Sequence, residues 1–496
     1  MRQGLTGHFS PMTSRDAAFI YQDRPGHEET LVGCYTFDAA TGTPSTESVA
    51  ALEKWMRPRL GAAPFLTSTV RRQPFDLGLP IWVPATHMNL ADHLHVHEIT
   101  GGPAELRRKL ADIAEGSVEL TRPPWELHAI NGARGVEGVD AVTTVVLKVH
   151  HCAADGMGFR TLESTLFSAD PDAAIGAPRK APHPVESVAR GVLNAPGKTL
   201  RFVRHARRTS ADMDEVTRLE QEQDGLVPRK DRPFTRLNRQ RTGRTGIAVT
   251  SFALADLRAA RNRVEGATVN DVLLTIVGRA LHRQLTDLGE PPSGSLAAYV
   301  PISLQIPDTR SGKARADEYT HLSATKLVIG IVDLHSDLED ATGRLAAVSA
   351  AAQTEKLRWM SESVRNARSR VDEAPAPLLA LQGWIHRNRT PEESAGRWKR
   401  NTMISNLPAP AGEPELDGAR LVTCFGILPP LDGDRLRHLF TTGRDRVNLC
   451  VSSDDSVLPD LDAYLAGIHE ELRSLLGARR TRDGSGERRD QPDLGV

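Results

Sequence analysis

The spacing of apolar and polar residues divides the chain into two segments of mixed helix and strand, with a polar connection between them. In the first segment, near-continuous apolar runs over 31–37 and 139–151 predict strands. Apolar residues three or four positions apart predict amphipathic helices over 48–60, 105–118 and 159–167. We therefore expect an α/β domain over residues 1–180.

The same two patterns return after residue 236. The clearest helix covers residues 268–285, with Thr268 as its expected N-cap and Asp271 at the third helical position. Strands are predicted over 245–254, 295–304, 326–334 and 447–453, and a closing amphipathic helix over 461–476. A second α/β domain is thus expected over residues 236–477.

Residues 181–235 form the predicted connection, which is rich in Pro, Arg and Lys. Within it, 185–193 and 199–208 combine apolar and basic residues, so they lie on an anionic membrane surface or pack as solvated linker helices on the protein itself. The last segment, 478–496, is charged and almost without apolar residues, which predicts disorder.

Charge and composition exclude several classes of protein. The formal net charge of the 496 residues is -1, which gives no overall attraction to nucleic acid. The four cysteines form no CxxC pair, which argues against a zinc ribbon or a disulfide framework and fits a reducing cytoplasm. The first residues show no signal-peptide pattern, and no run reaches the ~20 apolar residues of a membrane span. We expect a cytoplasmic protein, peripheral on the inner face of the membrane if it handles lipid.

The segment that carries chemistry is 150–156, His-His-Cys-Ala-Ala-Asp-Gly, directly after a predicted strand. Side chains alternate along a strand, so only one of His150 and His151 can address a given cleft. A histidine titrates near neutral pH, and it can therefore accept the proton of an alcohol while the oxygen attacks an acyl carbonyl. The alternative is a structural histidine pair beside an ordinary turn.

Asp155 and Gly156 form a turn pair after the histidines. Asp155 either orients His151 directly or pairs with a distant arginine and fixes the loop, and the second role is favoured. Gly156 leaves room for a substrate close to the backbone. Cys152 is unsuited as a nucleophile activated by His151, since adjacent strand residues face apart.

These residues resemble the HHxxxDG motif of the bacterial wax ester synthase/diacylglycerol acyltransferase family, and the resemblance covers roughly residues 8–476. Further matching elements are Ser10-Pro11-Met12, Asp16 to Phe19, Pro123-Pro124-Trp125, Asn270-Asp271-Val272, Val300 to Ser303 and Ser405 to Pro408. Two departures are Pro124 in place of Leu and Ala409 in place of Gly. The family's Gly-Asn pair after the VPxS strand is also absent.

The resemblance implies two domains similar to chloramphenicol acetyltransferase, with mixed sheets and the active site at their interface. It implies transfer of an acyl group from acyl-CoA to a lipid alcohol, either diacylglycerol or a fatty alcohol. His151 would be the catalytic base, with His150, Asp155 and Gly156 completing the motif. Asn270, Asp271 and Trp125 would belong to the substrate-binding region, although Asn270 could equally be a hydrogen-bonding residue at a helix N-terminus.

The resemblance implies no metal and no cofactor besides the co-substrate acyl-CoA. Because the products would be insoluble, we also expect peripheral attachment to a membrane or lipid-droplet surface. His93, His95 and His97 would share one face of a strand, but no carboxylate or cysteine has the spacing to complete a zinc site with them. Two alternatives stay open: a condensation-type acyltransferase with another hydroxyl or amine acceptor, and a non-catalytic lipid-binding relative. The sequence does not indicate an oligomeric state.

Overall fold

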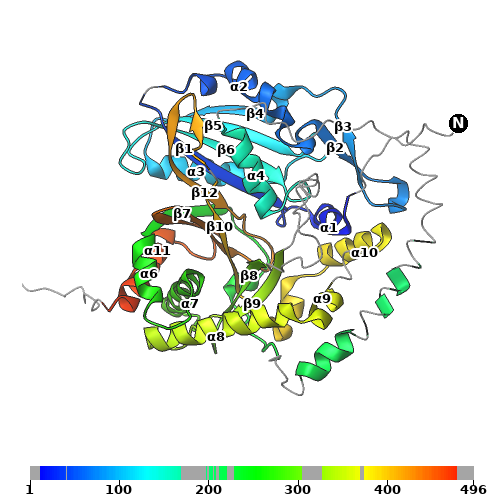
Figure 1. Ribbon diagram of the computed structural model, residues 1–496, viewed down its shortest axis with the longest axis vertical. Coiled ribbons are helices and arrows are strands. Elements are labelled where there is room, and N and C mark those ends of the chain that lie inside the picture. Colours follow the sequence, from blue (N-terminus) through cyan, green and yellow to red (C-terminus); the bar gives the residue numbers. More distant parts are fainter. Residues whose placement is uncertain are drawn as a thin grey trace, which may run out of the picture.

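The computed structural model describes residues 12–40, 42–168, 228–303, 327–368, 374–410 and 412–477, with parts of 197–220. Two six-stranded sheets form the two halves of the molecule (Figure 1), which confirms the α/β class with two mixed sheets. The predictions for residues 478–496 and for most of 181–235 fall outside the described residues.

The first sheet has the strand order β11-β12-β1-β6-β5-β4. Its strands are β1 (Thr30–Asp38), β4 (Leu94–Glu98), β5 (Trp125–Ala133), β6 (Val142–His150), β11 (Glu415–Leu416) and β12 (Ala419–Ile427). All nine residues of β6 are buried, because helices cover both faces. The helices α2 (Val49–Met56) and α4 (Gly156–Leu166) pack on one face, and α3 (Pro103–Ala114) packs on the other.

Two helices of this half begin and end differently from the prediction. Helix α2 stops at Met56, and the chain continues as a 3-10 helix to Ala62, because Pro58 has no N–H to donate to the preceding turn. Helix α3 begins earlier than predicted, at Pro103, where the fixed φ of proline suits the first helical position.

Strand β12 comes from the second half of the chain but lies in the first sheet, antiparallel to β1 (Figure 1). The first sheet therefore takes in residues 415–427, which follow the predicted division of the chain at residue 236. Without β12, the edge of β1 would present a row of unpaired backbone groups, and the crossing strand satisfies them. The backbone hydrogen bonds between β12 and β1 also hold the two halves of the molecule together.

The second sheet has the order β7-β14-β13-β10-β8-β9. Its strands are β7 (Thr245–Ala253), β8 (Ala297–Ser303), β9 (Leu327–Asp333), β10 (Thr402–Pro408), β13 (Leu436–Thr442) and β14 (Arg446–Asp454). Its helices are α6 (Leu254–Arg261), α7 (Val269–Asp287), α8 (Ala341–Met360) and α11 (Leu461–Leu475). Further described elements include the helices α1 (Ser14–Gln22), α9 (Glu362–Arg368) and α10 (Ala376–Arg387), and a two-stranded sheet of β2 (Ser68–Arg71) and β3 (Ile81–Pro84).

Helix α7 is confirmed together with its expected start. The side chain of Thr268 accepts a hydrogen bond from the backbone of Asp271, and the Asp271 carboxylate accepts one from the backbone of Thr268, at 3.2 and 2.8 Å. This reciprocal pair is a capping box, which satisfies two N–H groups that the helix leaves without partners. Apolar residues of α7 then pack into the core of the second half.

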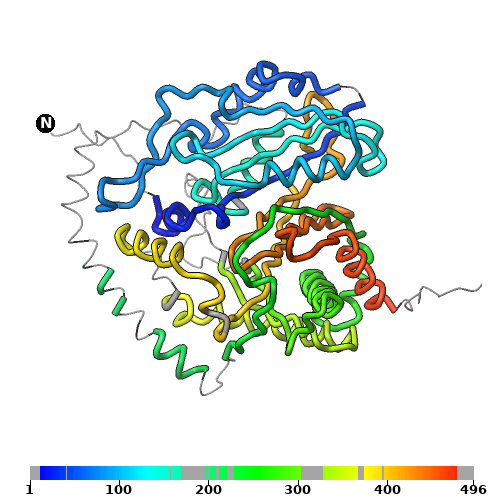
Figure 2. The backbone as a smooth tube through the Cα atoms, turned by 180° about the vertical axis from the view of Figure 1, so that it is seen from behind, coloured from blue at the N-terminus to red at the C-terminus, as the bar shows by residue number. Residues whose placement is uncertain are grey.

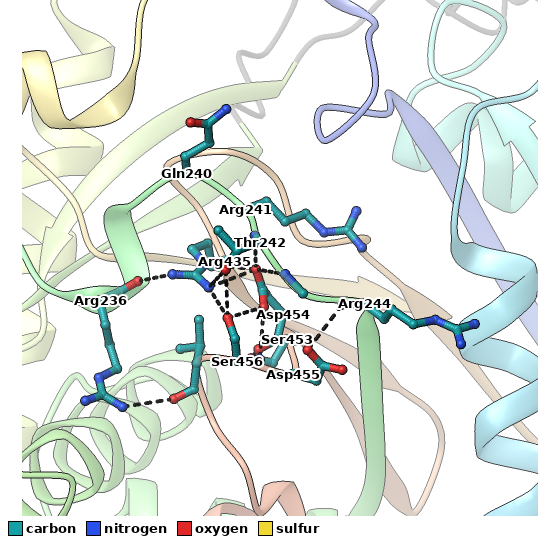
Figure 3. A network of polar contacts seen from close by, with 12 residues as sticks. Arg236, Gln240, Arg241, Thr242, Arg244, Arg435, Ser453, Asp454, Asp455 and Ser456 are labelled. Carbon is teal, nitrogen blue, oxygen red and sulfur yellow. Dashed lines mark hydrogen bonds and ion pairs between the residues drawn. The ribbon is translucent and has the colours of Figure 1, made fainter.

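A buried polar network fixes the chain where it enters the second sheet (Figure 3). The Arg435 guanidinium donates to the Asp454 carboxylate from Nε at 3.0 Å. That carboxylate also accepts the backbone N–H groups of Thr242 and Gly243, at 2.8 and 3.1 Å. From this fixed loop, the nearly buried Arg241 reaches across to Glu115 of the first half.

The arginine-rich segment 229–244 is thus engaged in ion pairs. Its pairs are Arg229–Glu355, Arg232–Asp333, Arg236–Glu290, Arg241–Glu115 and Arg244–Asp112. Each of these five guanidinium groups meets a carboxylate, which offsets much of the positive charge of the segment. None of the described helices has both the length and the apolar character that a bilayer span requires.

Candidate active site

His150 is the last residue of β6 and its side chain is completely buried. Its Nδ1 accepts the backbone N–H of Cys152 at 3.1 Å, and its Nε2 lies 3.7 Å from the Asp23 carboxylate. Nδ1 therefore acts as an acceptor, and Nε2 faces the Asp23 carboxylate. These contacts give His150 a structural role, in which it holds the turn after the strand.

His151 follows the end of β6 and differs from its neighbour in every contact. Its backbone N–H donates to the Glu29 carbonyl at 2.8 Å, just before the first residue of β1. Its ring is partly exposed and stacks on Phe19 of α1, with centroids 4.0 Å apart and planes at 17°. Its Nδ1 is buried without a hydrogen-bond partner among the described residues, which leaves Nε2 as the nitrogen available to a substrate.

The surroundings of His151 favour its neutral form. Burial lowers the pKa of His151, and the neighbouring His150 adds to this, while the Glu29 and Asp155 carboxylates oppose it. The net pKa shift is downward, so the ring is unprotonated at neutral pH. A neutral imidazole can accept a proton, which is the requirement for a general base.

Glu29 can stabilise the charge that such a base acquires. Although burial raises the pKa of Glu29, the hydrogen bond with His27, whose Nε2 lies 3.2 Å from the carboxylate, helps to keep the net pKa below its usual value. The carboxylate is therefore ionised, and it interacts electrostatically with His151. A negative charge at this place favours the imidazolium that forms when His151 takes up a proton.

Asp155 is the N-cap of helix α4. Its carboxylate accepts the backbone N–H of Gly158 at 2.7 Å. The favoured prediction, a pair with a distant arginine, is wrong for the part of the chain that the structure describes: the hydrogen bond that fixes the side chain is local. The loop is nevertheless held by Asp155, because an N-cap determines where the helix begins.

Gly156 lies where the two halves of the molecule meet. A Cβ atom at this position would come within 3.3 Å of the Leu407 side chain, which belongs to β10 of the second sheet. Leu407 lies within the Ser405 to Pro408 element, so the structure brings two of the sequence elements together. The loop that carries the motif therefore packs directly on the opposite half.

Trp125 belongs to the core of the first half. It is fully buried, its indole Nε1 donates to the Leu66 carbonyl at 3.0 Å, and its ring stacks on His93. These contacts give Trp125 a packing role in this structure, and a substrate contact of Trp125 stays a prediction. Large aromatic rings are typical of such positions, where their single polar atom finds a partner.

Asn270 and Asp271 lie at the start of α7, which packs against α6, α8 and α11 of the second half. Asp271 is buried, and its carboxylate accepts the backbone N–H of Thr268 in the capping box. This hydrogen bond gives Asp271 a structural role at the start of the helix. Asn270 is partly exposed in the first turn. A substrate-binding role of Asn270 stays a prediction.

Sequence reasoning did not assign to the site two residues that interact with the His151 ring. Phe19 and Glu29 come from α1 and from the chain just before β1, more than a hundred residues away in the sequence. Phe19 carried one signal, its place in the segment 16–19 that resembles the family. Glu29 carried none, because an isolated carboxylate before a strand has no local pattern.

The model of the wax ester synthase/diacylglycerol acyltransferase catalytic domain matches residues 12–273, and the model of the C-terminal domain of the same enzymes matches residues 326–476. A relative in Mycobacterium tuberculosis H37Rv is 26% identical over 97% of this chain and 93% of its own. Another from the same strain is 28% identical over 83% of this chain and 86% of its own. Both carry the provisional name diacylglycerol O-acyltransferase.

Solved structures show the same fold. The wax ester synthase/diacylglycerol acyltransferase of Marinobacter aquaeolei VT8 is similar with a TM-score of 0.62 and 20% identity, over 95% of this chain and 100% of its own. The starter condensation domain of rhizomide synthetase, solved with C8-CoA, is similar with a TM-score of 0.53 and 11% identity, over 95% of both chains.

Proposed function

The chain belongs to the wax ester synthase/diacylglycerol acyltransferase family and is an acyltransferase, and we propose that it transfers a long-chain acyl group from acyl-CoA to the hydroxyl of diacylglycerol or a fatty alcohol. The observation that carries the proposal is the position of His151. It is a neutral, partly exposed imidazole after a buried strand, in a loop that faces the second half of the molecule.

In the proposed reaction, His151 Nε2 accepts the hydroxyl proton while the alcohol oxygen forms a bond to the thioester carbonyl. The product of this step is a tetrahedral oxyanion beside an imidazolium. The Glu29 carboxylate stabilises the imidazolium electrostatically. Collapse of the oxyanion breaks the carbon–sulfur bond, and the departing CoA sulfur takes the proton from the imidazolium. The ester and free CoA are the products.

The proposed donor is acyl-CoA. The support comes from the condensation domain of the same fold, whose structure contains C8-CoA. A thioester is already an activated acyl group, so proton transfer by one base is sufficient chemistry. We therefore propose that the reaction uses no metal ion, no cofactor and no covalent acyl-enzyme.

The experiment that tests the proposal measures CoA release from palmitoyl-CoA with a panel of diacylglycerols and fatty alcohols. The wild-type protein is compared with His151→Ala and with the matched control His87→Ala, which removes an exposed histidine. Release that depends on an acceptor, persists in His87→Ala and EDTA, and falls at least a hundredfold in His151→Ala would support the proposal.

Two results would overturn it. Acceptor-dependent release at an undiminished rate in a folded His151→Ala protein would exclude His151 as the base. Absence of release with every acceptor would exclude this donor and acceptor class, and the same assay with carrier-bound acyl groups and amine acceptors would then test the condensation-type alternative.

The proposed site of lipid entry is helix α10. Four of its large apolar side chains are exposed, at spacings that place them along one side: Leu378, Leu381, Trp384 and Ile385. Its opposite side packs against α1, the helix that carries Phe19, and Figures 1 and 2 show the two helices side by side. An apolar helix surface with a tryptophan is typical of an interfacial segment. We propose that this surface contacts the lipid that contains the acceptor.

A further inference from the structure

A second group of imidazole and carboxylate side chains lies away from His151, at the edge of the first sheet. Strand β4 is the outer strand and runs parallel to β5, with His95 opposite His128. Glu126 lies two residues before His128, so the two side chains occupy the same face of β5. The rings of His95 and His128 stack with centroids 4.5 Å apart.

The possible ligand atoms of His95, Glu126 and His128 all lie within 4.8 Å of one another. The closest measured pair is His128 Nε2 and Glu126 Oε2, at 3.4 Å. Two ligands that each lie ~2.0–2.2 Å from a tetrahedral Zn²⁺ are separated by roughly 3.3–3.6 Å. The His128–Glu126 pair already has this separation, and a ligand atom of His95 on the edge strand lies within 4.8 Å of both.

His97 occupies the position that orients a metal-binding histidine. Its Nε2 lies 3.2 Å from Nδ1 of His128, on the other side of that ring from Glu126. When the Nδ1 proton of His128 is donated to His97, the lone pair of His128 Nε2 faces Glu126. A partner at the second ring nitrogen is the usual means by which a protein fixes the tautomer of a metal ligand.

Access and charge are compatible with a cation at this place. His95, His97 and Glu126 are partly exposed, so an ion can enter from solvent. Two lysines interact with the group, Lys109 with His97 and Lys148 with His128. The Lys148 ammonium is occupied by the carbonyls of Ile113 and Glu115, each at 2.9 Å, and the Glu126 carboxylate offsets its charge.

We propose that His95, Glu126 and His128 bind one divalent transition-metal ion, with Zn²⁺ as the expected species, and that His97 orients His128. Two imidazoles and one carboxylate suit zinc, cobalt, nickel or copper, whereas magnesium and calcium prefer oxygen ligands alone. The ion joins the edge strand β4 to β5. The sequence prediction rejected a metal because no carboxylate or cysteine has the spacing to complete a site with the histidines of β4. In the proposed site, the neighbouring strand β5 supplies the two further ligands, Glu126 and His128.

The test uses tag-free protein dialysed against Zn²⁺, followed by elemental analysis, and thermal unfolding with and without the ion. The expected result is one equivalent of bound zinc and a rise in the unfolding temperature. His95→Ala and Glu126→Gln should each weaken binding at least tenfold. His87→Ala, which removes an exposed histidine outside the group, should bind as the wild type does. Bound Co²⁺ should give the visible absorption of a low-coordinate site.

Three results would overturn the proposal: no bound zinc in the wild type, equal binding by folded His95→Ala and Glu126→Gln, or equal loss in His87→Ala. Each would mean that the group is a hydrogen-bond network alone or that zinc binds elsewhere. Both informative variants change partly exposed side chains, and circular dichroism checks that they fold. The acyl-transfer activity is not a readout, so failure of this proposal and failure of the proposed function are separate outcomes.

Discussion

The ring of Phe19 lies almost parallel to the imidazole of His151, with centroids 4.0 Å apart. This contact joins α1 to the end of β6. It fixes the plane of the imidazole and covers one of its faces from water. Because burial is the largest influence on the pKa of His151, the contact connects the position of the ring with its protonation state.

We expect Phe19→Ala to lower kcat about tenfold with little effect on the unfolding temperature, since an aromatic pair contributes ~0.5–1.5 kcal/mol beyond its buried area. The vacated space admits water, so the pKa of His151 should rise toward 6.5. Steady-state kinetics across pH check both effects. Phe19→Leu, which keeps most of the apolar cover, should shift the pH profile less. An unchanged kcat and pH profile in Phe19→Ala would show that the contact does not position His151.

The wild-type pH profile gives a direct test of the base. Only neutral His151 accepts a proton, and burial holds its pKa below the usual 6.5. The value of kcat/KM should therefore be constant at neutral pH and fall only as the pH drops below about 6.5. A midpoint above pH 7 would contradict the environment described for His151. Glu29→Gln removes a charge that raises this pKa, so its midpoint should lie at still lower pH.

Asp155→Ala should lower the free energy of unfolding by ~1 kcal/mol through loss of the N-cap. Urea denaturation measures this change. Asp155→Asn keeps an oxygen that can accept the Gly158 N–H, and it should retain most of the stability and the activity. If Asp155→Asn were as inactive as Asp155→Ala while folded, the negative charge rather than the cap would be the function of this residue.

Asp454 should contribute more to stability than any exposed carboxylate. Its side chain is completely buried against Arg435, and the loss of one member of a buried pair costs ~3–5 kcal/mol. Asp454→Asn is therefore strongly destabilising, whereas Asp455→Asn, an exposed neighbour, should change stability by less than ~1 kcal/mol. Urea denaturation of the two variants measures the difference.

The pH dependence of this effect has a definite sign. Although burial opposes the charge, hydrogen bonds from Ser456, Thr242 and Gly243 lower the pKa of Asp454 to about 2. A carboxyl whose folded-state pKa is depressed stabilises the protein above its unfolded-state pKa near 3.8. The contribution is lost as the pH falls from about 4 toward 2. The stability gap between wild type and Asp454→Asn should therefore be constant from pH 7 to 5 and shrink below pH 4.

Helix α10 provides a test of lipid contact. Leu381→Asp and Trp384→Ala remove exposed apolar surface, so both should reduce flotation with liposomes and raise KM for the lipid acceptor. Activity toward an acceptor presented in detergent should change little. The exposed Leu357 of α8 offers a matched control, and Leu357→Asp should float as the wild type does. Equal flotation of all variants would exclude α10 as the contact surface.

Much of the local structure could be predicted from the sequence. Helix α7 and its cap follow from Thr268, Asp271 and an uninterrupted 3.6-residue period. Strand β6 follows from its β-branched run. These elements are encoded by neighbours in the chain, whose propensities and spacing act over a few residues. The pairing of β12 with β1 could not be predicted in this way, since the two strands are almost four hundred residues apart in the sequence.

The sequence alone predicts that the motif His150 to Gly156 follows a buried strand and that only one of the two histidines faces a given cleft, because side-chain alternation is a local property of strands. The groups that surround His151 follow only from the tertiary fold. Phe19 reaches it from α1, and Glu29 reaches it from the chain just before β1. Likewise, Glu126 and His128 meet His95 only because β4 and β5 pair in parallel. Tertiary packing brings together residues that are far apart in the sequence, and the spacing of residues along the chain does not indicate such contacts.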